Sequence, residues 1–141
     1  MIYILDASAL LRFTDREHGF DRVRLLLHGA AIGENRIFLS AVNWGEILAV
    51  LHKKNAANAE AILANLAALP ITIVDVDAGV AERAGRFKCQ HSIPFADAFA
   101  GALTLEYSNS HKPDTATLVT ADYDFKNVSK GTIKIEFLPS K

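Results

Sequence analysis

The sequence lacks the features that mark several classes of protein. Its single cysteine, Cys89, excludes an internal disulfide bond and therefore a secreted scaffold held together by disulfides. It contains no apolar run of the ~18–20 residues that a membrane-spanning helix needs. Residues 1–6 have no basic stretch and reach an acid at Asp6, which is unlike a signal peptide. We expect a protein of the reducing cytoplasm with no membrane segment.

An excess of charge of one sign is also missing. The 15 Lys and Arg residues and 16 Asp and Glu residues leave a net charge of −1, unlike the basic balance that is typical of general nucleic-acid binders. If four acids lie together in a metal site, 15 basic residues face 12 acidic ones elsewhere, and the remaining surface is mildly basic. The 141 residues, 50% of them hydrophobic, suit one domain over residues 1–141 with a substantial core.

Short apolar segments alternate with longer segments of helical periodicity. The pattern predicts strands at residues 2–5, 37–39, 71–76, 118–120 and 132–138. It predicts helices at residues 20–31, 40–54, 56–69, 78–89 and 94–107, and a polar loop at 108–116. This alternation indicates an α/β fold, a three-layer sandwich whose mostly parallel central sheet has helices on both faces. In such sheets, functional side chains gather beyond the carboxyl ends of the strands.

Acidic residues follow two of the expected strands. Asp6 comes directly after the first strand, and Asp122 comes soon after the strand at 118–120, with Asp124 two residues later. Aspartate is also a good helix N-cap, so each of these residues alone is explained equally well by capping.

Two further acids lie on helices of apolar character. Glu46 has Asn43 three residues before it, so the two side chains share one helix face. Asp97 has no lysine or arginine at helical spacing. An unpaired carboxylate is costly to bury, which favours a ligand or a paired core group, although both acids could instead point to solvent.

The joint pattern points to a divalent cation. Four carboxylates in one pocket would repel one another and raise each other's pKa values, and a bound cation relieves this. Oxygen ligands without histidine or cysteine partners favour Mg²⁺ or Mn²⁺ over zinc. Such an ion activates a water molecule and stabilises charge on a phosphoryl group during in-line displacement.

Four acidic segments follow one another along nearly the whole chain. They are Leu-Asp-Ala-Ser-Ala-Leu-Leu at residues 5–11, the helix around Glu46, Pro-Phe-Ala-Asp-Ala-Phe at 94–99, and Thr-Ala-Asp-Tyr-Asp-Phe at 120–125. In this order, and on these elements, they resemble the motifs of the PIN domain, and most closely those of VapC-type toxins from bacterial toxin–antitoxin pairs.

The resemblance implies a metal-dependent endoribonuclease that cuts RNA, such as tRNA or rRNA. The residues expected to be catalytic and to hold Mg²⁺ or Mn²⁺ are Asp6, Glu46, Asp97 and Asp122. Supporting roles are expected for Ser8, Asn43, Thr120 and Asp124. The resemblance also implies a homodimer and a cognate antitoxin protein that places a basic side chain near the acids. The broad apolar faces of helices 20–31 and 56–69 agree with such interfaces.

Three other functions share some of these ingredients. A phosphatase of the haloacid-dehalogenase type also uses Mg²⁺ and an aspartate after the first strand, but it needs a second aspartate where this chain has Ser8. A phospho-receiver domain needs a set of acids and a lysine that these strand ends do not offer well. A catalytically silent PIN-like interaction module would keep the acids to bind a partner's arginines, and only a cleavage assay separates it from a nuclease.

Basic residues and histidines carry weaker signals. Surface roles are the default for Arg12, Arg86 and Lys88, and the alternative is that they border the acids and hold RNA phosphates. The histidines have no metal-ligand spacing, so we expect them to be structural or exposed: His18, His28, His52, His91 and His111.

Overall fold

The computed structural model describes residues 1–140, and its centre is a five-stranded sheet with the order β3-β2-β1-β4-β5. The strands are β1 (Ile2–Leu5), β2 (Arg36–Ser40), β3 (Thr72–Val74), β4 (Ala116–Thr120) and β5 (Lys134–Phe137). Every neighbouring pair is parallel. The predicted α/β class and parallel sheet are therefore confirmed.

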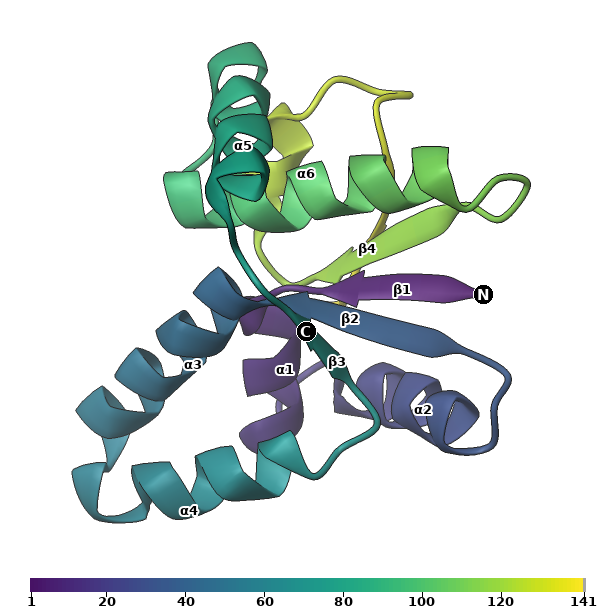
Figure 1. Cartoon of the computed structure of the whole chain (residues 1–141). Helices are drawn as coiled ribbons and strands as arrows, with labels where there is room; N and C mark the ends of the chain where they lie inside the picture. Colours follow the sequence, from purple (N-terminus) through teal and green to yellow (C-terminus); the bar gives the residue numbers. More distant parts are fainter. Residues whose placement is uncertain (141) are drawn as a thin grey trace.

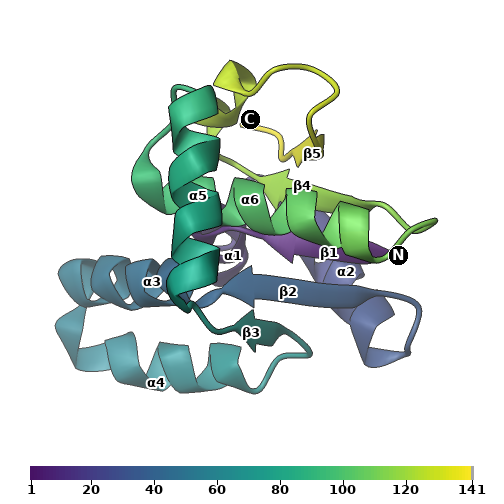
Figure 2. The same cartoon turned by 45° about the horizontal axis from the view of Figure 1, so that its top comes forward.

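Helices cover both faces of this sheet (Figures 1 and 2). The helices are α1 (Ala7–Thr14), α2 (Phe20–Ala31), α3 (Ala41–Lys54), α4 (Ala56–Ala67), α5 (Ala78–Gln90) and α6 (Phe95–Ser110), with a short 3₁₀ helix, η1 (Tyr123–Asn127). Helices α1 to α4 lie on one side and α5 and α6 on the other, where α5 crosses α6 (Figure 1). None of the helices within residues 1–140 is long and apolar enough to cross a membrane.

The central strand β1 shows why the strands are apolar along their whole length. Tyr3 and Leu5 pack into the core under α1 to α4, whereas Ile2 and Ile4 pack into the core under α5 and α6. Successive side chains of a strand point to opposite faces, so a sheet covered on both sides needs apolar residues at every position. All four residues are buried.

Two elements were absent from the sequence interpretation. Helix α1 begins immediately after β1, and Asp6 caps it by accepting a hydrogen bond from the backbone N–H of Ala9 at 2.9 Å. The 3₁₀ helix η1 begins in the same way at Asp122, which accepts from the N–H of Asp124 at 2.9 Å. The prediction of a loop from residue 108 was also wrong at its start, because α6 continues to Ser110.

The parallel topology brings distant parts of the chain to one edge. The carboxyl ends of β1, β2 and β4 lie at the same edge, since β2 and β4 each pair in parallel with β1 between them. Helices α1 and α3 start at this edge, directly after β1 and β2. The edge is therefore the place where Asp6, Asp122 and the first turns of α3 can meet.

Candidate functional site

A cavity of about 200 Å³ opens at the carboxyl edge of the sheet. Its charged lining residues are Asp6, Glu46, Asp97 and Asp122, and the remainder of the lining is Ala7, Ser8, Leu11 and Val50. We call it the acidic cavity. The four acids that the sequence singled out come from the residue after β1, from α3, from α6 and from the segment after β4, and the fold brings all of them together.

Asp6 is the most buried of these acids, with 3% of its surface exposed. Its Oδ1 accepts from Ser8 Oγ at 2.7 Å and from the N–H of Ala9, and its Oδ2 accepts from Thr120 Oγ1 at 2.5 Å. Burial raises the pKa of Asp6 to about 6, because desolvation outweighs these hydrogen bonds, which lower it. Asp6 is therefore both a helix cap and part of the cavity, so the two interpretations of this residue are compatible.

The hydroxyls of Ser8 and Thr120 join the ends of β1 and β4. Ser8 Oγ accepts from the N–H of Ala121 at 2.9 Å while it donates to Asp6. Thr120 Oγ1 accepts from the N–H of Asp122 at 2.9 Å while it donates to Asp6. Each hydroxyl thus uses its single proton on Asp6 and its lone pairs on the next segment. This network holds Asp6 and Asp122 in a fixed relation.

Asp97 is the acid of the cavity whose pKa is raised most. Its pKa is raised to about 8, first by burial and then by its hydrogen bond to Asp122 and the negative charges of Asp122, Asp6 and Glu46. Its Oδ2 is buried without a hydrogen-bond partner. A buried carboxylate oxygen that faces other carboxylates and has no donor is suited to a cation.

Asp124 belongs to the same cluster. One carboxylate oxygen from each of Asp97, Asp122 and Asp124 lies within 4.8 Å of the others. Asp124 is more exposed than the other two, and it is outside the lining of the acidic cavity. Asp124 was expected only in a supporting role, and its two-residue spacing from Asp122 does not reveal how close its carboxylate lies to that of Asp97.

Glu46 stands on α3 opposite these aspartates. Asn43, one turn before it, is 1% exposed and donates from Nδ2 to Glu46 Oε1 at 2.8 Å. The same nitrogen donates to the carbonyl oxygen of Ala96 at 3.3 Å. Asn43 therefore touches both Glu46 and the residue before Asp97, a contact across 53 residues that helical spacing alone does not predict.

Within the part of the chain that the structure describes, the acids of the acidic cavity form no ion pair with a lysine or arginine. Within residues 1–140, the ion pairs join other residues, namely Arg22–Glu136, Arg24–Asp21, Lys54–Asp15, Arg83–Glu106 and Arg86–Glu82. The donor set consists of carboxylate oxygens, which is the chemistry of Mg²⁺ and Mn²⁺ sites. The residues present therefore fit a hard divalent cation.

The basic residues considered for RNA contact are engaged within the protein. Arg12 Nη1 donates to the carbonyl oxygens of His18 and Pro139 at 2.9 and 3.2 Å. Lys88 Nζ donates to the carbonyl oxygen of Ile93 at 2.8 Å, and Arg86 pairs with Glu82. Arg12 also lines a neighbouring hollow that shares Ser8 and Leu11 with the acidic cavity.

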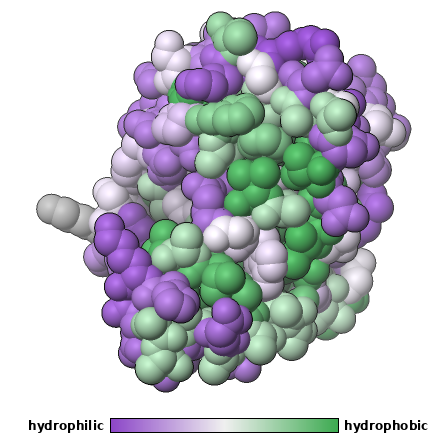
Figure 3. Space-filling model, turned by 60° about the vertical axis from the view of Figure 1, so that its left-hand side comes forward, coloured by the Kyte–Doolittle hydropathy of each residue, from purple (hydrophilic) through white to green (hydrophobic). Residues whose placement is uncertain are grey.

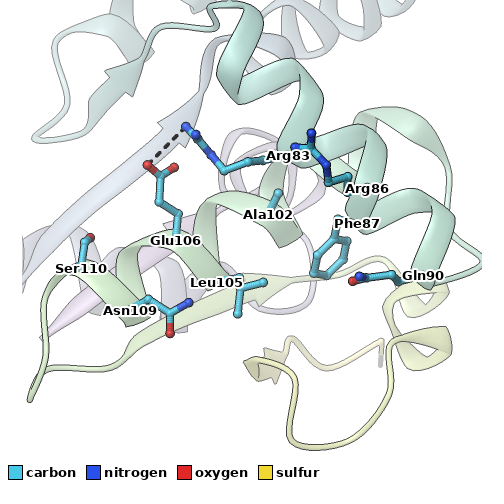
Figure 4. Close-up of a pocket in the computed structure, with 9 residues that line it drawn as sticks. All are labelled: Arg83, Arg86, Phe87, Gln90, Ala102, Leu105, Glu106, Asn109 and Ser110. Atoms are coloured by element: carbon cyan, nitrogen blue, oxygen red, sulfur yellow. Dashed lines mark ion pairs between the residues drawn. The ribbon is translucent and has the colours of Figure 1, made fainter.

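A second and larger hollow lies between α5 and α6, with a volume of about 510 Å³ (Figure 4). We call it the α5–α6 groove. Arg83 and Glu106 face each other across it at 3.3 Å, and Phe87 and Leu105 supply apolar surface (Figure 4). Its charges are paired and its only acid is Glu106, so it lacks the convergent unpaired groups of the acidic cavity.

Comparison with known proteins gives a family and a fold. The model of the PIN domain family matches residues 3–131. No curated protein matches the sequence. A chain of the VapBC2 complex from Rickettsia felis, bound to a DNA fragment from its promoter, is similar in structure, with a TM-score of 0.73 and 18% identity over 99% of this chain and 100% of that one.

Two further solved structures share the fold. VapC20 from Mycobacterium tuberculosis, a Sarcin-Ricin loop cleaving toxin, aligns with a TM-score of 0.67 and 16% identity over 94% of this chain and 98% of that one. A chain of a toxin–antitoxin complex from Klebsiella pneumoniae aligns with a TM-score of 0.64 and 17% identity over 93% of this chain and 94% of that one.

Proposed function

The chain is a member of the PIN domain family, and from this premise we propose that it is a metal-dependent endoribonuclease, the toxin of a VapBC-type toxin–antitoxin pair. The observation that carries the proposal is the acidic cavity itself. Four carboxylates from four segments line it, they take part in none of the ion pairs found among residues 1–140, and Asp97 Oδ2 is buried without a donor. Such an arrangement is costly unless a cation binds there.

The acids of the cavity differ in how many of their carboxylate oxygens are free to bind the ion. Asp97, Asp122 and Asp124 offer oxygens that lie together, whereas both oxygens of Asp6 already accept hydrogen bonds. When bound, Mg²⁺ or Mn²⁺ supplies an activated water and stabilises charge on the phosphoryl oxygens of RNA. Ser8 and Thr120 keep Asp6 in place, so that its charge faces the same cavity without a change of rotamer.

A phosphatase of the haloacid-dehalogenase type is not favoured by this geometry. Its second aspartate would stand at Ser8, and the Ser8 hydroxyl here donates to Asp6 instead of acting on a substrate. A catalytically silent interaction module keeps the same acids, and it differs from a nuclease only in the outcome of a cleavage assay.

Cleavage of RNA by the purified protein tests the proposal. With Mg²⁺ or Mn²⁺ we expect phosphodiester cleavage that EDTA stops and that zinc does not restore, because the cavity has no thiol or imidazole. Asp97→Asn should fold and should cut RNA at least about 100-fold more slowly, since a charged metal ligand is worth several kcal/mol in the transition state. Cleavage by Asp97→Asn at the wild-type rate, or wild-type cleavage in EDTA, would contradict the assignment.

An antitoxin protein is the expected partner, as in the VapBC complex from Rickettsia felis. An antitoxin arginine in the acidic cavity would neutralise the carboxylates in place of the ion and so inhibit cleavage. Figure 3, which brings the left-hand side of Figure 1 forward, shows apolar side chains gathered to the right of centre and in the lower part of this face, next to hydrophilic ones, which suits a protein partner. A peptide from the cognate antitoxin should inhibit, and its Arg→Ala version should not; equal inhibition by both would assign the effect to steric cover.

A homodimer completes the proposal. On α2, Leu26 and Leu27 are buried, but Leu25 is 57% exposed, and Ile32 just beyond the helix is 56% exposed. This exposed apolar surface supports association, in keeping with the broad apolar face expected for that helix. Sedimentation at tens of micromolar protein should give a dimer, and a clean monomer would rule out this part of the proposal.

A further inference from the structure

We propose that Asn43 is a positioning residue of the acidic cavity: its amide ties Glu46 on α3 to the first turn of α6 and so sets where the Glu46 carboxylate stands relative to Asp97. The inference deepens the proposed function and rests on it, in that it takes the acidic cavity for the metal site. The juxtaposition that carries it is one nitrogen, Asn43 Nδ2, in contact with Glu46 Oε1 at 2.8 Å and with the Ala96 carbonyl oxygen at 3.3 Å.

The orientation of this amide follows from its surroundings. Glu46 Oε1 and the Ala96 oxygen are both acceptors, so only the NH₂ end of Asn43 can face them, and its two protons are just sufficient for the two contacts. The carbonyl end, Asn43 Oδ1, is then buried without any partner. The amide thus donates both of its protons to Glu46 and α6, and its own oxygen is left without a hydrogen bond.

That unpaired oxygen argues against a purely structural role. Leaving a buried acceptor unsatisfied costs about 1–3 kcal/mol, so an apolar side chain at residue 43 would serve α3 better if packing were its purpose. Residues of this kind persist where a site needs them. Asn43 stands 1% exposed between the two helices that carry Glu46 and Asp97, where it can act on the acids without touching RNA.

Glu46 needs a group that positions it relative to Asp97, because the two acids are carried by separate helices, α3 and α6. Glu46 is carried by α3, which packs beside α4 under one face of the sheet, while Asp97 is carried by α6 on the other face (Figure 1). A glutamate has three rotatable side-chain bonds, and like charges nearby push it away from Asp97. The hydrogen bond from Asn43 counters that repulsion and holds Oε1 at the cavity.

A double-mutant cycle on metal affinity tests this role. Mn²⁺ affinity is measured by calorimetry for wild type, Asn43→Ala, Glu46→Ala and the double variant. Since groups that orient metal ligands are typically worth about 10–100-fold in affinity, Asn43→Ala should weaken Mn²⁺ binding at least tenfold. In the Glu46→Ala background the same change should alter affinity less than about twofold, because Asn43 then has no carboxylate to position.

A matched control separates positioning from loss of a buried polar group. Thr104 is 0% exposed, and its hydroxyl donates to the Ala100 carbonyl oxygen within α6 at 2.8 Å, so Thr104→Val also removes a buried hydrogen bond. It should leave Mn²⁺ affinity within twofold of wild type. Equal losses for Asn43→Ala with and without Glu46, or no loss at all, would overturn the inference.

A measurement on the intact side chain covers the case in which Asn43→Ala does not fold. In metal-free wild type, the Asn43 side-chain NH₂ should give two distinct NMR signals that exchange slowly with water, and Glu46→Ala should shift them and speed their exchange. Unchanged signals would overturn the inference. If the wild type binds Mn²⁺ but cuts no RNA, the proposed nuclease activity is overturned, while the double-mutant cycle on Mn²⁺ affinity still tests the role of Asn43. If the wild type binds no Mn²⁺, both proposals are overturned.

Discussion

The acidic cavity and the α5–α6 groove differ in size and in whether their charged side chains are paired. The α5–α6 groove is the larger, about 510 Å³ against about 200 Å³, yet its Arg83 is paired with Glu106 across it. The smaller acidic cavity has four carboxylates that join none of the ion pairs among the described residues 1–140. The candidate functional site is therefore indicated by unpaired charges that converge from several segments, and not by the volume of the cavity.

The origin of the difference lies in the topology. The acidic cavity is built at the carboxyl edge of the sheet, where loops and helix starts from four segments meet. The α5–α6 groove is built where two neighbouring helices cross and pack on each other, so its walls are largely packing surface. Each prediction below changes one of these two hollows or the packing beside it.

The largest expected effect is the response of the two hollows to metal. At a concentration a hundredfold above its Kd, Mn²⁺ should stabilise the wild type by about 2.7 kcal/mol and raise its Tm by roughly 5–15 °C. Asp97→Asn should lose most of this shift, whereas Glu106→Gln in the α5–α6 groove should keep it. Thermal melts with and without EDTA measure both; equal shifts in the two variants would contradict a metal site in the acidic cavity.

A smaller effect is expected from overpacking the buried contact between α5 and α6 beside the groove. A Cβ at Gly101 would lie 2.5 Å from Cε1 of Phe87, a ring that is 2% exposed and has little room to move. Gly101→Ala should therefore lower the free energy of unfolding by about 1–3 kcal/mol. Gly85→Ala on α5 is the matched control, since nothing lies within 4 Å of its Cβ and it should be neutral or stabilising.

Urea unfolding measures both glycine variants, and calorimetry follows their Mn²⁺ affinity. Packing in the groove is separate from the acids, so Gly101→Ala should bind Mn²⁺ as wild type does. A large loss of affinity would show that the two hollows are coupled through α6, which carries both Gly101 and Asp97.

The pH dependence of the metal-free protein is a further test of the acidic cavity. The folded-state pKa values of Asp97 and Asp6 are raised from 3.8 to about 8 and about 6, so the folded protein holds these protons more tightly than the unfolded chain does. The resulting stability is fully present below pH 3.8 and is lost as the pH rises through about 6 and about 8. Urea unfolding in EDTA should therefore show stability falling from pH 5 to pH 8, by the direction of these shifts.

Asp97→Asn should flatten this dependence, most of all in its upper part near pH 8, because the amide does not titrate. Glu106→Gln should keep the wild-type profile. A metal-free wild type that gains stability over this pH range would contradict the clustering of the acids.

The smallest effect is expected from the ion pair of the α5–α6 groove. Arg83 and Glu106 have side chains that are 45% and 36% exposed, and pairs of this kind contribute about 0.2–1 kcal/mol. Arg83→Met should change the free energy of unfolding by less than about 1 kcal/mol, and added salt should reduce the difference further. A loss well above that, in the same urea assay, would give the groove a stabilising role that its exposure does not suggest.

Much of the fold was predictable from residue patterns. The apolar segment at residues 2–5 and the β-branched segment that contains β3 both predicted strands, because burial on two faces leaves a near-continuous apolar run. Helix α1 was not predicted, since it begins one residue after β1 and its boundary depends on Asp6 acting as the cap. A short strand and a helix that join without a loop merge into one apolar pattern in the sequence.

The sequence by itself determined which residue types could form a site: acids after strands, and acids on apolar helices without basic neighbours, such as Asp6 and Asp97. Only the tertiary structure decided how they meet, because the edge at which they converge is created by parallel pairing of strands far apart in the chain. The contact of Asn43 with Ala96 and the approach of Asp124 to Asp97 depend on how whole helices pack. Local periodicity carries no information about such packing, since it describes one element at a time.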